Sequence, residues 1–273
     1  PPQVPGALTS LNPSRSSRLE TGAPGVSGTI QMLQLAQVLS ETDIRIPVRG
    51  TMSLEFVRSY HNPWGYHRAE FSNWLGWRPY KNTIGESWTH NLNAHMRTTD
   101  SGDTAVFVGP QGDTITYAFD RVENGFRYFE VPSGTKRSRS LFHTVKQDTT
   151  TDEFFVIFPG GITYEFSAPV TSGQDDPYCR LERISDGLSN AIELEYDFSG
   201  IFSVWGRLVK ATPPGYDALG AERRYIEFNY NIDHQLDSVR LMDGTTELKK
   251  VEYAYETDVN PMLIAVEVND NAN

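Results

Sequence analysis

The stretch Ala191-Ile-Glu-Leu-Glu-Tyr196 decides the fold of this 273-residue chain, because apolar and acidic residues alternate along it. In an extended chain the isoleucine, leucine and tyrosine fall on one face and the two glutamates on the other. Alternation with a period of two is typical of a half-buried antiparallel strand. The same pattern returns in Tyr225-Ile-Glu-Phe-Asn-Tyr230 and in Lys250-Val-Glu-Tyr-Ala-Tyr255. The sequence therefore predicts strands, each ending in an apolar residue, any residue and a tyrosine.

These strands belong to a unit that repeats along the C-terminal half of the chain. Its leucine anchors are spaced 27, 28 and 27 residues apart, at Leu181, Leu208, Leu236 and Leu263. Self-similarity at such a period indicates a repeat architecture, in which each unit buries its apolar face only by stacking on its neighbours. Turn sequences such as Ser185-Asp-Gly187 and Met242-Asp-Gly244 tie the strands into hairpins.

The same pattern of alternating strands and turns extends upstream, with less regular spacing. Five further strands are predicted, at Thr104–Val108, Thr114–Phe119, Phe126–Val131, Glu153–Phe158 and Ile162–Phe166. A looser end is typical of the terminal, capping part of a repeat array. Because an isolated hairpin is marginal in water, successive hairpins are expected to pair edge to edge. The predicted fold is therefore all-β, with antiparallel hairpin repeats forming a curling, spiralling sheet.

Composition and charge limit the class of protein. Apolar residues make up 38% of the chain, with 13 Tyr, 14 Phe and 5 Trp, which suits strands and a real core. A net charge of −11 argues against nucleic acid or an anionic membrane as the main partner. The single cysteine, Cys179, excludes an internal disulfide and a multi-cysteine zinc site, and is interpreted as a buried packing residue. No apolar stretch is long enough for a membrane-spanning helix.

The chain divides into three predicted regions. Residues 1–25 are rich in proline and serine and are expected to be a linker or an extended arm. Residues 26–100 form a lead-in region, in which Thr51–Tyr60 is a predicted strand. Ile30–Leu39 is either a short helix or a strand, because its apolar residues fit neither period cleanly. Residues 101–273 hold the hairpin repeats. The start at a proline, without an initiator methionine or a signal peptide, predicts a processed product or a piece of a longer polypeptide.

One aromatic loop, residues 61–81, breaks the repeat pattern inside the lead-in region. Its notable residues are Trp64, Tyr66, Phe71, Trp74, Trp77, Arg78 and Tyr80. One interpretation is a plug whose aromatic side chains close the open end of the sheet. The other is a contact surface, since aromatic and arginine side chains anchor protein interfaces and stack on sugars. Burial of Trp74 and Trp77 would distinguish the two.

Candidate catalytic and metal-binding groups are few. His90 and His95 are five residues apart in a region expected to be extended, which would place their rings on opposite faces and disfavours a metal pair. His90 is instead expected to support the turn after Trp88 through a hydrogen bond. The carboxylates of Asp175-Asp176 and Asp152-Glu153 lie among turn residues and are interpreted as solvated. With no catalytic triad, nucleophile elbow, phosphate loop or dinucleotide motif, no enzymatic activity, metal or cofactor is predicted.

Several segments together resemble Rhs proteins. The lead-in residues concerned are Ser40-Glu-Thr-Asp43, Ile46-Pro-Val-Arg-Gly50, Leu54-Glu-Phe-Val-Arg-Ser-Tyr60 and Gly85-Glu-Ser-Trp-Thr-His-Asn91. The downstream units, such as Glu195-Tyr196-Asp197 followed by Gly206-Arg207-Leu208, resemble YD (tyrosine–aspartate) repeats. The resemblance covers about residues 28–273. Toxin-complex C components and teneurins are related to the same family.

The resemblance implies a large spiralling sheet that closes into a hollow shell. In bacterial members the shell encloses a C-terminal toxin, and an internal aspartyl autoprotease with an Asp-Pro-x-Gly type motif releases it. This chain departs from that pattern, because its one Asp-Pro pair, Asp176-Pro177, is followed by Tyr178-Cys179 and not by glycine at the required place. The chain thus resembles the opening part of a shell, without the autoprotease or the cargo.

The leading hypothesis is a structural, non-catalytic N-terminal portion of a bacterial Rhs-like shell, secreted or displayed on the cell surface. Its expected partners are the rest of its own polypeptide or neighbouring copies, a toxin cargo, or a component of a secretion apparatus. The alternative is a cell-surface adhesin that binds glycan or protein through the aromatic loop 61–81. The strand Met262–Val268 is expected to end the sheet as an edge, with Met262, Ile264, Val266 and Val268 in one apolar row.

Overall fold

The computed structural model describes the strands and most of their connections. The described residues are 17–20, 26–31, 36–47, 52–61, 84, 88–99, 101–132, 143–171, 177–188, 190–199, 206–214, 224–256 and 263–270. Within them the chain is all-β, and every strand pair is antiparallel. The described helical structure is one short 3-10 turn, η1 (Asn91–Asn93). No helix in these ranges has the length and apolar character needed to cross a membrane.

The first sheet contains the lead-in strands in chain order. They are β1 (Ser17–Glu20), β2 (Val26–Gln31), β3 (Ala36–Pro47), β4 (Ser53–His61) and β5 (Trp88–His90). The predicted strand at Thr51–Tyr60 is confirmed as β4. Of the ambiguous stretch Ile30–Leu39, the described residues 30–31 and 36–39 lie in strands β2 and β3. Strand β1 lies inside the proline- and serine-rich segment and pairs with β2. The three predicted region boundaries stay predictions.

The second sheet begins as a closed ring of eight strands. They are β6 (His95–Thr98), β7 (Thr104–Val108), β8 (Thr114–Glu123), β9 (Phe126–Glu130), β10 (Thr144–Asp148), β11 (Phe154–Ile157), β12 (Thr163–Phe166) and β13 (Tyr178–Ser185). The ring closes because β13 pairs with β6 through its first residues and with β12 through its later ones. Of these strands, β10 was not predicted from the sequence.

The inside of this ring is packed with side chains. Buried residues from successive strands point inward, namely Met96, Phe107, Tyr117, Phe129, Val145, Phe154, Phe166 and Leu181. A closed sheet of eight strands leaves an interior that is just wide enough for side chains to fill. The first closed part of the sheet is therefore a solid core, in contrast to the hollow shell that the resemblance implies for whole family members.

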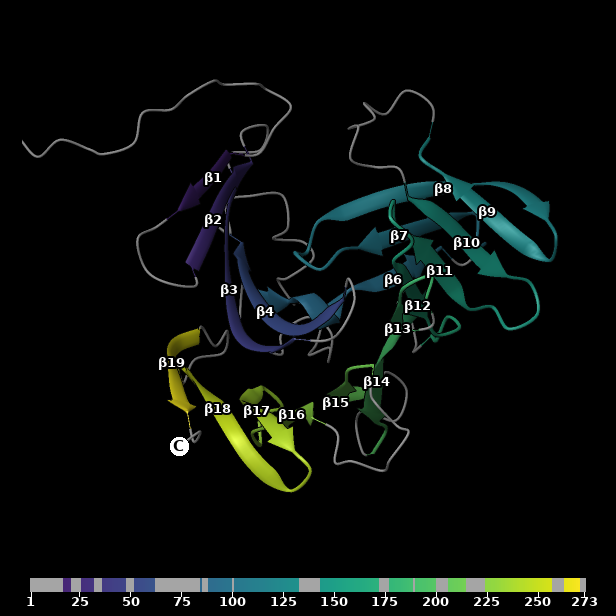
Figure 1. Ribbon diagram of the computed structural model, residues 1–273. Helices are drawn as coiled ribbons and strands as arrows, with labels where there is room; N and C mark the ends of the chain where they lie inside the picture. The colour runs from purple at the N-terminus through teal and green to yellow at the C-terminus, as the bar shows by residue number, and fades with distance from the viewer. Residues whose placement is uncertain are drawn as a thin grey trace, which may run out of the picture.

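From β13 the sheet continues as a curved arm of six strands (Figure 1). They are β14 (Ala191–Asp197), β15 (Arg207–Thr212), β16 (Arg224–Tyr230), β17 (Leu236–Asp243), β18 (Thr246–Tyr255) and β19 (Leu263–Asp270). The predicted curling sheet of antiparallel hairpins is thus confirmed. The lead-in sheet packs on the apolar face of the arm, where the rings of Phe56 and Phe228 lie 5.5 Å apart.

One detail of the predicted C-terminal edge is wrong. The expected apolar row assumed strict alternation, but the register of β19 against β18 shifts at Ile264. As a result Leu263 packs against the core on the same side as Val266. Val268, further along the edge strand, is 49% exposed. Met262 lies outside the described residues.

Candidate functional site

A hydrogen bond between a tyrosine and an anchoring leucine recurs in each unit of the arm. The tyrosine hydroxyl donates to the main-chain carbonyl of the leucine that opens the same hairpin, at 2.5 Å for Tyr196 to Leu181, 2.8 Å for Tyr230 to Leu208 and 2.7 Å for Tyr255 to Leu236. Each tyrosine also lies directly opposite the leucine that opens the next hairpin. We call this arrangement the tyrosine ladder. Both sequence anchors of the repeat are therefore parts of one contact.

A second feature recurs next to each anchoring leucine. In four successive strand pairs the register shifts by one residue immediately after the leucine, which leaves Glu182, Val209, Asp237 and Ile264 as bulge residues. A β-bulge bends its strand and increases the local twist. One bulge per unit bends every hairpin at the same place, which gives the arm its regular curl.

In two units the residue after the ladder tyrosine bonds to the residue before the next leucine. The Asp197 carboxylate accepts a hydrogen bond from Arg207 at 2.8 Å, and the guanidinium of Arg207 lies 4.9 Å from the ring centre of Tyr230. In the next unit an amide pair takes this place, with Asn231 bonded to the Gln235 side chain at 3.0 Å. Both pairs hold the strands at the same distance from the bulge, so an ion pair is not required there.

A buried charged cluster joins the lead-in sheet to the arm. The Asp43 carboxylate accepts from Arg58 Nε at 2.6 Å and from the Tyr253 hydroxyl at 2.7 Å, although Asp43 and Tyr253 are 210 residues apart. Arg58 also donates to Glu41. Asp43 and Arg58 are 4% and 3% exposed. We call these four residues the Asp43 cluster.

The local structure explains why the charges of this cluster meet. Asp43 is the bulge residue between Thr42 and Ile44 in the β3–β4 pairing, so its side chain leaves the strict alternation of the strand. Burial would lower the pKa of Arg58, but the hydrogen bond and the charges of Asp43 and Glu41 raise it overall. Arg58 therefore stays charged and is neutralised inside the protein.

His90 lies beside this cluster but does not have the predicted role. Its ring packs 5.1 Å from Phe56 and 6.5 Å from Phe228, and its Nδ1 has no hydrogen-bond partner. Burial lowers its pKa to about 3. The turn after Trp88 is held instead by Asn91, which accepts from the Val57 amide at 2.9 Å and donates to a β4 carbonyl at 2.8 Å.

The two histidines do not share a strand either. His90 ends β5 and His95 begins β6, with η1 between them, so the expectation of opposite faces on one extended strand was wrong. The described residues contain no group of three or more histidine, cysteine, aspartate or glutamate side chains that could hold a metal ion. Cys179 is buried, as predicted, and burial raises the pKa of its thiol.

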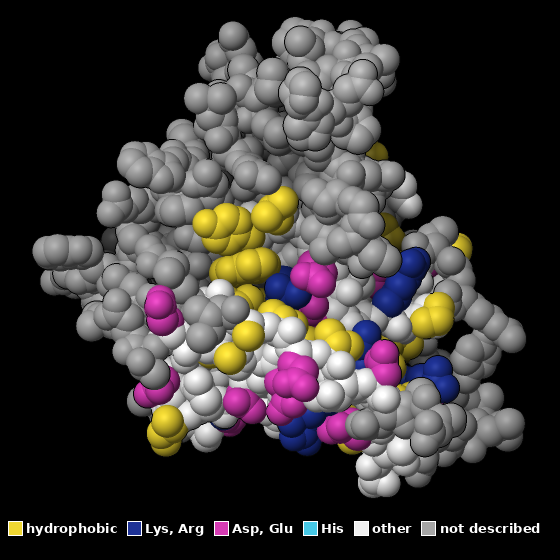
Figure 2. All heavy atoms as spheres, turned by 90° about the vertical axis from the view of Figure 1, so that its left-hand side faces the viewer, with side chains coloured by type: hydrophobic (Ala, Val, Ile, Leu, Met, Phe, Trp, Pro, Cys, Tyr) yellow, Lys and Arg dark blue, Asp and Glu magenta, His cyan; other side chains and the backbone are white. Residues whose placement is uncertain are grey.

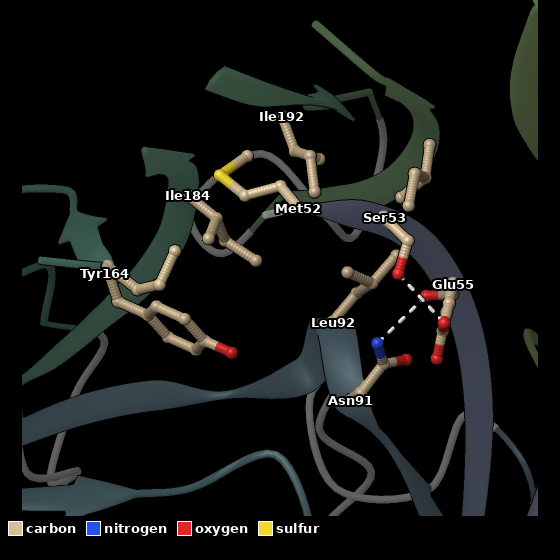
Figure 3. A pocket seen from close by; sticks show the side chains of 10 residues that line it. Met52, Ser53, Glu55, Asn91, Leu92, Tyr164, Ile184 and Ile192 are labelled. Atoms are coloured by element: carbon tan, nitrogen blue, oxygen red, sulfur yellow. Dashed lines mark hydrogen bonds between the residues drawn. The ribbon is translucent and has the colours of Figure 1, made fainter. Parts of the chain in front are cut away.

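A cavity of about 240 Å³ lies where the start of β4 meets strands β12 to β14 (Figure 3). Met52, Leu92 and Ile184 line its apolar part, and Tyr164, whose pKa burial raises to about 12, points into it. Its carboxylate, Glu55, accepts a hydrogen bond from Ser53 and pairs with Arg45 at 3.0 Å. The cavity is therefore lined mainly by apolar side chains, and the charge of its one carboxylate, Glu55, is neutralised by Arg45.

The predicted interaction residues cannot be placed. Trp64, Tyr66, Phe71, Trp74, Trp77, Arg78 and Tyr80 lie outside the described residues, as do Asp175 and Asp176. Sequence reasoning missed the Asp43 cluster, although Asp43 and Arg58 stand in the segments that carry the family resemblance. The available signal was a pair of opposite charges inside otherwise apolar, alternating strands.

Comparisons with known proteins agree with this geometry. Residues 36–117, from β3 into β8, match a family model described as "Domain of unknown function (DUF6531)". No curated protein matches the sequence.

Three solved structures share the fold. The N-terminal domain of the effector protein SpvB from Salmonella typhimurium strain LT2 has a TM-score of 0.52 at 12% identity, over 84% of this chain and 99% of that one. The Photorhabdus luminescens Tc holotoxin pore with the mutation TccC3-D651A has a TM-score of 0.53 at 12% identity, over 93% of this chain. TcdB2-TccC3 without its hypervariable C-terminal region has a TM-score of 0.53 at 15% identity, over 98% of this chain.

The chain spans only 15% and 16% of the two toxin-complex chains that it matches, but nearly all of the SpvB domain. At these identities the likeness shows a shared fold.

Proposed function

We propose that this chain is the structural opening segment of an Rhs-like β-shell, in which the packed ring caps one end and the arm starts the wall. The observation that carries the proposal is the tyrosine ladder, which repeats one contact in three successive units. The ladder also links neighbouring units, because each tyrosine lies directly opposite the leucine that opens the next hairpin. A wall made of YD-type repeats needs such a link, since each hairpin buries its apolar face only against its neighbours. The proposal includes no catalytic step.

The position of the lead-in sheet on the arm supports the role of a cap. Strands β3 and β4 lie against the apolar face of the arm, and the Asp43 cluster fixes them to β18. The space inside the first turn is therefore filled by the chain itself, so cargo would lie beyond this turn. Downstream sequence of the same polypeptide, such as a toxin or effector, is the partner that the proposal names.

The names of two similar structures support a secreted role in this proposal. One is called an effector protein and another a holotoxin pore. We extend this to the present chain as part of the proposal, with secretion from, or display on, a bacterial cell.

Electron microscopy of the full-length polypeptide, purified from its native source, tests the proposal. We expect β14 to β19 in the wall of a continuous sheet with the ring at its end, β19 hydrogen-bonded to a further strand, and enclosed density beyond the first turn. A polypeptide in which β19 borders solvent and nothing is enclosed would overturn it.

The adhesin alternative rests on the aromatic loop 61–81 and stays a prediction. Loss of glycan binding in a Trp74→Ala variant with an unchanged unfolding midpoint would favour it. Wild-type protein without glycan binding would remove its basis.

A further inference from the structure

Strand β19 is an open edge of the described sheet. It pairs with β18 on one side and with no described strand on the other. The other strands that carry an anchoring leucine, β13, β15 and β17, each have neighbours on both sides. An open edge presents unpaired amide and carbonyl groups and is a template for another strand. On this side of the molecule, hydrophobic side chains lie exposed among acidic and basic ones (Figure 2).

We propose that β19 is a strand-acceptor site with a fixed register, whose partner is an antiparallel strand ending in apolar-x-Tyr. The tyrosine hydroxyl of that strand donates to the carbonyl of Leu263. This inference rests on the proposed function and adds to it the chemistry by which the next strand is recognised.

The register follows from the three existing units. Leu263 lies opposite Tyr255, as Leu208 lies opposite Tyr196, and the bulge at Ile264 is already formed. In every earlier unit the carbonyl of the leucine in this position accepts a tyrosine hydroxyl from the following strand. No described strand follows β19 to bring a tyrosine to Leu263. The backbone of β19 therefore already has the register and the bulge of the earlier units, and it lacks only a tyrosine donor from a following strand.

Charge adds a second requirement for the partner strand. Glu267 is exposed and lies opposite Glu252, whose carboxylate is already paired with Lys250 at 2.5 Å. Within the described residues Glu267 has no cationic partner. Glu267 occupies the place in β19 that Arg240 has in β17, and Arg240 pairs in register with Lys250. A lysine or arginine at the place of Lys250 would thus lie opposite Glu267, where opposite charges stabilise a cross-strand pair.

A second copy of this chain does not offer such a strand in its described part. Its three strands that end in apolar-x-Tyr, β14, β16 and β18, already pair on both sides. Its own β19 is open but contains no tyrosine. The partner is therefore a strand from beyond these units, with the sequence features of β18.

The test adds this strand to the intact chain. A copy of Lys249-Lys-Val-Glu-Tyr-Ala-Tyr255 is fused behind Asn273 through a short Gly-Ser linker, which makes its docking intramolecular. Hydrogen exchange of the amides in Leu263–Asp270 is then compared with that of the unmodified chain. We expect clearly slower exchange in the fusion. A matched fusion whose final tyrosine is phenylalanine should exchange about 2- to 12-fold faster than the tyrosine fusion, as expected for one lost hydrogen bond.

Three other outcomes would overturn the inference. Equal exchange in the tyrosine and phenylalanine fusions would show that the hydroxyl does not set the register. Fast exchange in both would show that β19 accepts no strand. Slow exchange in the unmodified chain that depends on its concentration would assign the edge to a second copy. If the fusion is captured but microscopy shows β19 bare in the full polypeptide, the proposed function fails while the acceptor site stands.

Discussion

The three tyrosine hydroxyls of the ladder are donors that burial keeps protonated. Burial raises the pKa of Tyr196, Tyr230 and Tyr255, so each hydroxyl donates at any ordinary pH. The ring of each tyrosine packs against the same core as the apolar residue two positions earlier, as the alternation predicted. For Phe228, which is 3% exposed, this means that the face is dry and does not line a water-filled lumen.

Removing one ladder hydroxyl should weaken the arm by a small, defined amount. In Tyr230→Phe the Leu208 carbonyl loses its donor while the ring stays, so we expect a loss of about 0.5–1.5 kcal/mol in the free energy of unfolding, measured with urea. Tyr128→Phe is the matched control. Its ring stacks with Arg121, and its hydroxyl has no hydrogen-bond partner among the described residues. An equal loss in both variants would contradict a specific role for the ladder.

His90 should make stability depend on pH below neutrality. Its pKa is about 3 in the folded protein and about 6.5 when unfolded, so between these values only the unfolded chain binds the proton. Stability therefore falls as pH falls, by about 2 kcal/mol between pH 7.5 and pH 5. His90→Phe keeps an aromatic ring between Phe56 and Phe228. Urea unfolding across that pH range should show that this variant takes up about one proton fewer on unfolding than the wild type, and so has a shallower dependence of unfolding free energy on pH. The same slope in both proteins would show that His90 titrates normally.

At the scale of elements, the Asp43 cluster is the polar contact that fixes β3 and β4 to β18. A buried ion pair adds little net stability, because the desolvation of both charges offsets their attraction. Its effect is on geometry, since Asp43 is satisfied only when Arg58 and Tyr253 both reach it. The cluster therefore specifies how the lead-in sheet sits on the arm, while the apolar contact around Phe56 and Phe228 supplies most of the stability.

The losses from removing the two partners of this pair should not be additive. Asp43→Asn leaves the buried Arg58 charge with Glu41 as its remaining counter-charge, and we expect a loss of about 3 kcal/mol. In the double variant Asp43→Asn, Arg58→Met, the buried charge is gone, so the loss should be smaller than the sum of the two single losses. Urea unfolding of the three variants measures this coupling. Strict additivity would mean that the two groups do not interact in solution.

At the scale of the whole molecule, a closed ring and an open arm share one sheet. Every strand of the ring has a neighbour on both sides, whereas β19 and β1 each have one described neighbour. The closed part also encloses a continuous aromatic core around Phe107, Phe129 and Phe154. Local opening requires few broken contacts at an edge and many in the ring.

Hydrogen exchange along the chain should therefore be graded. Amides of β7, β11 and β12 should exchange most slowly, because their opening requires loss of the ring core. Amides of β1 and of the open side of β19 should exchange fastest. A Phe154→Ala variant should raise exchange throughout the ring before it affects the outer strands of the arm. Uniform exchange over all strands would show that ring and arm unfold as one unit.

Much of this fold was predictable from local patterns. The alternation in 191–196 and in 225–230 marked strands because each strand buries one face, and the spacing of the leucines marked the unit. Strand β10 escaped prediction, because Lys146 and Gln147 interrupt its apolar pattern. The pairing register could not be read from the alternation either. The bulge at Ile264 breaks the strict alternation, so the apolar residues of β19 do not form the single row that was predicted.

The sequence by itself determined the fold class, the repeating unit and which residues form the apolar face of each strand, since these depend on the order of residues within short segments. The tertiary structure alone decided the closure of the ring through β13, the tyrosine-to-leucine hydrogen bond and the meeting of Asp43 with Tyr253. Those contacts depend on where the curl of the sheet brings distant strands. That curl is the sum of the bends at successive bulges, and the sequence of one short segment does not determine this sum.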